Sequence, residues 1–307
     1  MAGSIRRGMV AFALACWGAI AFAGSLRYCQ SPVESSALEQ DRWMQVSAIV
    51  KSELERSGAK VALVSRSGLA LEWLGHRYSH AGVSLRASLN GPWSVRQLYF
   101  ACDEQRPRLF DQGMSGFVMG SRDPSLGFLS IVFLPVDQSL ALENTALDNG
   151  QALRWLGDTY SANAHAFSHR YQNCNQWLAE LLAAAWGSPS PDAQGRAWAQ
   201  QWLASQGFEP SVVRLVWPPL MWIAATLPWI HTDDHPETDL AVAQFRLTMP
   251  ASIETFVHRR YPQATRIELC YSESRVVVRR GWESLASDCV PDETDEVIGL
   301  HFATNSS

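Results

Sequence analysis

The sequence predicts an α+β protein in which a small antiparallel sheet packs on a helix that begins at Cys174. Two observations lead to this class: short apolar segments are separated by turn residues, and amphipathic helical segments flank them. The chain has 307 residues, 47% of them hydrophobic, and a net charge of only −5, which is typical of a packed globule. No basic patch of the kind that binds nucleic acid is present.

The N-terminus has the pattern of an export signal. Arg6 and Arg7 precede a short apolar run, and residues 21–23 form a small-x-small site. We expect residues 1–23 to be a Sec signal peptide, cleaved after Ala23, so that the mature chain is periplasmic or secreted from a bacterium. A retained anchor is a weaker alternative because the run is shorter than the roughly 20 residues of a membrane span. A lipoprotein signal at Cys16 is weaker still, and we expect no transmembrane segment after cleavage.

The predicted core, residues 24–187, begins with a helix and a short strand. Apolar residues of 37–57 fall on one helical stripe, and "KVALVSR" follows as an apolar strand. In the next strand, "SHAGVSLRAS", the side chains of His80, Gly82 and Ser84 face one way and those of the alternate residues the other. The turn "NGP" predicts that "WSVRQLYFAC" returns as the antiparallel partner. The continuous apolar run 127–136 predicts a central strand.

Helical segments follow this sheet. We expect one helix from residue 135 or 138 to 157 and a second over "CNQWLAELLAAAWG". From residue 188 to 307 we expect an extension packed on the core, with a helix near 196–206, a helical "IETFVHRRY" and a hairpin in "TRIELCYSESRVVVRRGW". The apolar segment 212–230 contains three prolines, which predicts a broken helix; a lid or a membrane-surface element is the alternative.

Cysteine parity points to a free thiol. Removal of the signal leaves Cys29, Cys102, Cys174, Cys270 and Cys289, an odd number in an oxidising compartment. Cys270 and Cys289 are close enough in sequence to close a loop. If Cys29 then pairs with Cys102, Cys174 is the free thiol, although other pairings are open.

Cys174 and His80 have the residue types of a nucleophile and its base. A reactive thiol needs a lowered pKa and a group that takes and returns its proton. Cys174 lies in the first turn of its predicted helix, where the helix dipole favours a thiolate, and His80 lies at the entrance of its strand. A metal pair at His165 and His169 lacks a third ligand. We interpret "HTDDHP" (231–236) as a solvated loop, and expect no metal or cofactor.

The segments "HAGVSL" and "NCNQWLAELL" resemble the circularly permuted branch of NlpC-type, papain-like cysteine hydrolases, in which the histidine strand precedes the cysteine helix. The resemblance covers about residues 59–187. It implies that Cys174 is the nucleophile, that His80 is the general base, and that a polar side chain on the next strand orients the imidazole. Gln97 is our candidate for that side chain. Glu104 and Tyr99 are the alternatives because the hairpin is longer than this branch usually shows.

We assign the oxyanion or substrate-binding role to the Cys174 amide with Asn173, Gln172 and Tyr78. The segments "RYSHAGVSLR", "PWSVRQLYFAC" and "YQNCNQW" also look like the secreted bacterial domain of unknown function 2145 family, which brings no established substrate. We therefore expect a cysteine hydrolase or acyltransferase that acts through a thioester on a peptidoglycan peptide or a lipid of the cell envelope. A non-catalytic binding or accessory protein that keeps the fold is the alternative.

Overall fold

The computed structural model describes Cys29 and residues 35–302, apart from residues 70, 122, 191, 194, 218–220, 222 and 223. The expected signal peptide, residues 1–23, lies outside the described residues and stays a prediction. Residues 36–307 form one of the two units of the chain, and the elements below belong to it.

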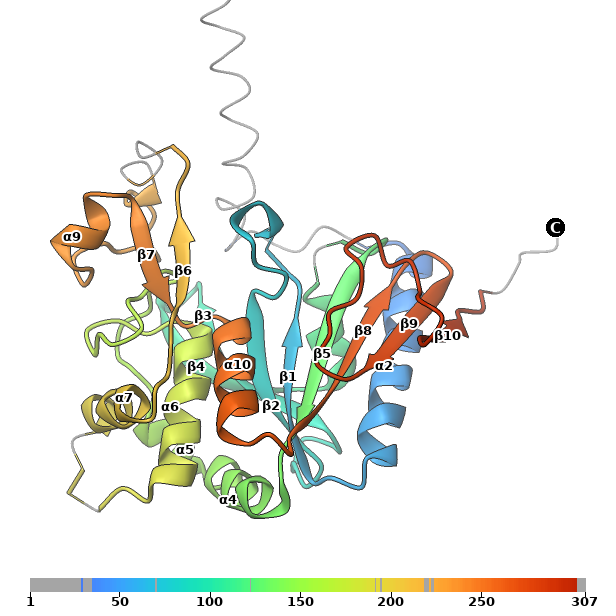
Figure 1. Cartoon of the computed structure of the whole chain (residues 1–307), viewed down its shortest axis with the longest axis horizontal. Coiled ribbons are helices and arrows are strands. Elements are labelled where there is room, and N and C mark those ends of the chain that lie inside the picture. Colours follow the sequence, from blue (N-terminus) through green and yellow to red (C-terminus); the bar gives the residue numbers. More distant parts are fainter. Residues whose placement is uncertain are drawn as a thin grey trace, which may run out of the picture. The chain divides into compact units, whose positions relative to one another are not determined.

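An eight-stranded antiparallel sheet organises this unit (Figure 1). Its strand order is β10-β9-β8-β5-β1-β2-β3-β4. The strands are β1 (Val61–Arg66), β2 (His80–Leu85), β3 (Ser94–Ala101), β4 (Arg106–Gln112), β5 (Gly127–Phe133), β8 (Thr265–Tyr271), β9 (Arg275–Arg280) and β10 (Glu296–Gly299). A separate two-stranded sheet pairs β6 (Ser211–Arg214) with β7 (Gln244–Leu247). The α+β class is confirmed, but the small sheet that we predicted is wrong.

Helices pack on both faces of the large sheet. They are α2 (Ala37–Arg56), α3 (Met114–Met119), α4 (Val136–Leu147), α5 (Asn149–Arg154), α6 (Cys174–Gly187), α7 (Gly195–Ser205), α9 (Glu237–Leu240) and α10 (Pro250–Arg260), with the short 3₁₀ helix η1 (Glu72–Leu74). Val64 packs with α2 and α3 in one apolar cluster. The next residue, Ser65, faces the other way and donates to Glu254 of α10 at 2.8 Å. Rings of Trp186 and Phe256 join α6 to α10.

Most of the expected elements are present. The segments predicted as strands form β1, β2, β3 and β5, and β5 is central because it pairs with β1 and β8. The helices expected over 37–57, 174–187, 196–206 and 253–261 are also present. The hairpin in the expected extension is β8 and β9, and with β10 these strands continue the same sheet.

One expected helix is wrong, and a second expected helical segment is wrong at its start. The segment 135–157 forms two helices, because the Asp148 backbone is extended and its side chain caps α5 by accepting from the Gln151 amide at 3.1 Å. The segment 212–230 begins inside a strand: Val212 and Val213 pair with β7, as β-branched residues favour. The remainder of that segment includes residues outside the described part of the chain.

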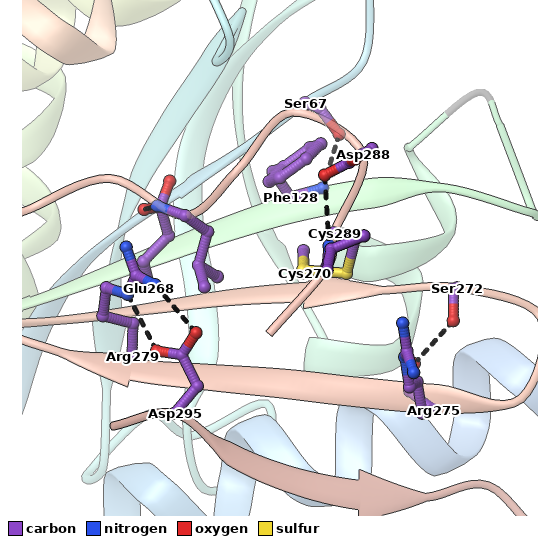
Figure 2. Close-up of a disulfide and its surroundings, with 12 residues drawn as sticks. Ser67, Phe128, Glu268, Cys270, Ser272, Arg275, Arg279, Asp288, Cys289 and Asp295 are labelled. Carbon is purple, nitrogen blue, oxygen red and sulfur yellow. Dashed lines mark hydrogen bonds and ion pairs between the residues drawn. A yellow bond between two sulfur atoms is a disulfide. The ribbon is translucent and has the colours of Figure 1, made fainter. Parts of the chain in front are cut away.

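The disulfide Cys270–Cys289 confirms one expected pairing. Figure 2 shows it joining β8 to the loop that carries Cys289, near the ion pair of Arg279 with Asp295. Cys29 and Cys102 are also disulfide-bonded. Among the described cysteines Cys174 has the free thiol, as parity predicted.

Removing this disulfide by Cys270→Ser with Cys289→Ser is expected to lower the free energy of unfolding by about 2 kcal/mol, because the bond restrains the unfolded chain. Urea unfolding of both proteins measures the difference, and the slope of each transition reports any change in the denatured state. An unchanged midpoint with an unchanged slope would contradict this expectation.

Candidate active site

The first turn of α6 is fixed against the start of β2. The Asn175 side chain accepts from the Ala81 amide at 2.9 Å and donates to the Ser79 carbonyl at 3.2 Å. Ser79 and Ala81 flank His80, so the residue after Cys174 is bonded to both neighbours of His80. The helix begins here because Asn173 is its N-cap, with a capping box to Gln176.

The His80 imidazole is hydrogen-bonded to Gln97, our candidate for the side chain that orients it. The imidazole Nε2 lies 2.7 Å from Gln97 Oε1, and Gln97 Nε2 donates to Gln112 Oε1 at 2.7 Å. Because an amide oxygen can only accept, Nε2 carries the proton and Nδ1 keeps its lone pair. Gly82 allows this close packing, since a Cβ there would lie 3.1 Å from Gln97 Cβ and 2.6 Å from Val95 Cγ1.

Burial keeps the side chains of His80 and Cys174 neutral at pH 7. It lowers the pKa of His80 to about 3, with a further lowering by the Arg66 charge that the Gln97 hydrogen bond opposes. Burial raises the pKa of Cys174 to about 11, against the Arg66 charge and the hydrogen bonds of the Asn175 amide and the Tyr160 hydroxyl. The residues are 7% and 8% exposed. The thiolate expected from the helix start is therefore wrong for the resting state: desolvation outweighs the favourable groups.

Within the described chain, no hydrogen bond joins the Cys174 sulfur to His80, whose recorded side-chain bond goes to Gln97. The resting site is thus a neutral thiol and a neutral imidazole held on adjoining elements. Such a pair exchanges a proton only after a movement of one side chain or the arrival of a substrate.

The other predicted side chains are used inside the fold. Gln172 donates to Glu180 at 2.6 Å and to the Trp155 carbonyl at 2.8 Å, and accepts from the Gly157 amide at 2.7 Å. Asn173 accepts from the Gln176 amide at 2.7 Å as the helix cap. We correct the Gln172 assignment, because both hydrogens of its amide are committed. Asn173 donates to the Thr248 carbonyl at 3.3 Å and keeps one amide hydrogen, so its role stays a prediction.

The substrate-binding role assigned to Tyr78 is also corrected, because its hydroxyl is committed inside the fold. Its hydroxyl donates to Glu268 and accepts from Arg266 at 3.1 Å, and the residue is 6% exposed. Of the alternatives to Gln97, Tyr99 packs its ring 5.0 Å from the imidazole, whereas Glu104 binds Arg106 and Arg108 at the surface.

Sequence reasoning missed Tyr160 and Arg66. Tyr160 lies in the loop before α6, and no local pattern marked it. Arg66 is the partner of His80 in the register of β1 with β2. A charged residue at the end of the otherwise apolar run "VALVS" was a signal that could have identified it.

The histidines outside this site give no metal centre in the described part of the chain, where no group of three or more His, Cys, Asp or Glu residues is placed to hold a metal. The interpretation of 231–236 as a solvated loop is wrong at two positions: the side chains of Asp234 and His235 are 1% and 0% exposed. Asp234 accepts from the His165 amide at 2.9 Å, and His235 bonds to the Asn163 carbonyl at 2.7 Å.

Fold and site together define an α+β protein with a buried free cysteine at a helix start beside an amide-bonded histidine. The chain belongs to the family described as "Uncharacterized protein conserved in bacteria (DUF2145)", whose model matches residues 53–257. This confirms the resemblance to that bacterial family. Searches of curated proteins and of solved structures found no match. Within the described residues, no helix has both the length and the apolar character of a membrane span.

Proposed function

We propose that the protein is an exported cysteine-dependent hydrolase or acyltransferase with a permuted papain-like core, acting on an amide or ester of the bacterial cell envelope. The observation that carries the proposal is the pair of Asn175 hydrogen bonds that holds the first turn of α6 on both sides of His80. The Gln97 bond supports it, because it leaves His80 Nδ1 as the proton acceptor.

In this reaction the Cys174 sulfur attacks the carbonyl carbon, a sulfur–carbon bond forms, and the bond from carbon to the leaving nitrogen or oxygen breaks. His80 carries protons between sulfur, leaving group and water. Water or a second acceptor then cleaves the thioester and releases the sulfur. The Cys174 and Asn175 amides at the helix start are the candidate oxyanion donors.

The cell envelope is proposed because the family is bacterial and the chain contains disulfides, which persist in oxidising compartments. Envelope peptides and lipids supply the amide and ester groups. A non-catalytic binding or accessory protein is the second candidate. The observation that favours it is the buried, protonated resting thiol, which reacts slowly as a nucleophile.

The test is to trap an acyl group on Cys174. The protein is incubated with envelope peptidoglycan fragments and lipids, quenched in acid, and mapped by mass spectrometry. We expect a hydroxylamine-labile mass on the Cys174 peptide, absent in Cys174→Ala. In His80→Gln its rate of formation is expected to fall by about 10² to 10⁴.

The matched control is His76→Gln, because His76 lies on the loop before β2 and its Nε2 has no hydrogen-bond partner. This variant is expected to form the adduct at the rate of the unmodified protein. Absence of any Cys174 adduct, or equal adduct in His80→Gln, would favour the binding protein instead.

A further inference from the structure

Arg66 is a buried cation directly beside the proposed base. It is 6% exposed, and it is the cross-strand partner of His80. Because register partners of an antiparallel pair point to the same face, its side chain shares the face of the imidazole. Its charge acts on both His80 and Cys174.

Neutral groups hold the guanidinium. Its Nη2 donates to the Tyr99 hydroxyl at 3.1 Å, and its Nη1 donates to the Gly120 and Ser67 carbonyls. Its Nε is buried without a hydrogen-bond partner. Glycines at 68 and 120 leave room for it: a Cβ at Gly120 would lie 2.5 Å from Arg66 Cζ, and one at Gly68 would lie 2.6 Å from Nη1.

No carboxylate balances this charge in the described part of the chain. The acids on the neighbouring elements are used elsewhere: Asp111 pairs with Arg96, Glu180 pairs with Arg196, and Asp123 accepts from Ser125. Glu254 and Glu268, across the sheet, pair with Arg266. A buried cation without a counter-ion is costly, so a nearby group that can become negative gains stability from it.

Cys174 is that group. The titratable residues beside it are His80 from β2 and Tyr160 from the loop before α6, and neither has a carboxylate. We propose that the Arg66 guanidinium is the counter-ion of the Cys174 thiolate, so that the reactive site is a guanidinium–thiolate pair beside a neutral imidazole. This deepens the proposed function and rests on it for the role of Cys174.

In the ionisation step the sulfur keeps the electron pair of the S–H bond and the proton passes to water. After attack, His80 takes up at Nδ1 the proton that was released to water and passes it to the leaving nitrogen or oxygen. His80, neutral again, then accepts the proton of the water molecule that cleaves the thioester, and returns it to solvent.

Alkylation of Cys174 by iodoacetamide, followed on the Cys174 peptide by mass spectrometry between pH 7.5 and 9.5, tests the pair without a substrate. Below the thiol pKa the rate follows the thiolate fraction, so the loss of one pKa unit of stabilisation costs tenfold. Arg66→Gln is expected to alkylate at least about tenfold more slowly at each pH, and Arg66→Lys to recover most of the rate.

Arg96→Gln is the matched control. Arg96 lies on β3, and its charge is already balanced by Asp111 at 2.6 Å, so its rate is expected to stay within about threefold of the unmodified protein. Near-ultraviolet circular dichroism checks that each variant keeps its tertiary packing. An unchanged or faster rate in a folded Arg66→Gln would overturn the proposal.

His80→Gln decides between the two possible ion pairs, even if Arg66→Gln does not fold. A guanidinium–thiolate pair predicts a loss below about threefold, because His80 is neutral throughout; an imidazolium–thiolate pair predicts a loss of about tenfold or more. The second result would reject the role of Arg66. It would leave the proposed acyl chemistry standing, since that depends on the separate adduct experiment.

Discussion

Arg196→Ala is expected to lower the free energy of unfolding by about 3 to 5 kcal/mol, because it leaves the Glu180 carboxyl buried without its partner. Glu180 is 0% exposed, and Arg196 donates to its two oxygens at 2.8 and 3.1 Å. Burial raises the pKa of Glu180 against the opposing Arg196 charge. Urea unfolding at pH 7 measures the effect.

An exposed pair gives the control. Arg259 and Glu209 lie 2.8 Å apart, but their side chains are 47% and 75% exposed, so Arg259→Ala should cost less than about 1 kcal/mol. An equal loss of unfolding free energy in the two variants would show that burial of the ion pair does not determine the effect. Arg196 also donates to the Tyr171 and His169 carbonyls, so its loss is expected to loosen the loop that leads to Cys174.

Acid is expected to destabilise the fold through His80. The pKa of His80 is about 3 in the folded chain, against an ordinary value of 6.5. Between these values the unfolded chain binds a proton that the folded chain does not, so stability is complete above pH 6.5 and is lost as the pH falls. At pH 4 this single group accounts for a loss of about 3 kcal/mol.

His80→Gln removes the titrating group and is expected to flatten this dependence by about 3 kcal/mol between pH 7 and pH 4. Unfolding in urea at the two pH values, for the unmodified protein and the variant, measures it. The exposed His301 supplies the control, and His301→Gln should follow the unmodified protein. Parallel pH dependence in all three proteins would show that His80 is not buried as a neutral imidazole.

Local patterns predicted the separate elements better than their assembly. Alternation and turn residues located β2 and β3, and helical spacing located α2 and α6. The size of the sheet was not predictable, because β5 pairs with β8 from a distant part of the chain and no local signal specifies that pairing. The break between α4 and α5 depends on one capping side chain, Asp148.

The sequence predicted those parts of the candidate site that depend on the identity of a single residue. Parity identified the free Cys174, and the short list of polar residues on the return strand included Gln97, which the structure bonds to His80. Their catalytic roles remain predictions. Arg66 and Tyr160 were missed because strand register brings Arg66 to His80 and a loop path brings Tyr160 to Cys174. The protonated thiol was missed because desolvation depends on the complete packing.

The position of β8 has a practical consequence for experiments on fragments. The family match ends at residue 257, before β8, yet β5 uses one whole edge to bind β8, and Glu268 of β8 accepts from the buried Tyr78 hydroxyl. A fragment cut to residues 53–257 would expose an apolar strand edge that is open to aggregation and leave Tyr78 without its acceptor. Expression boundaries should therefore reach beyond Gly299, the last residue of β10.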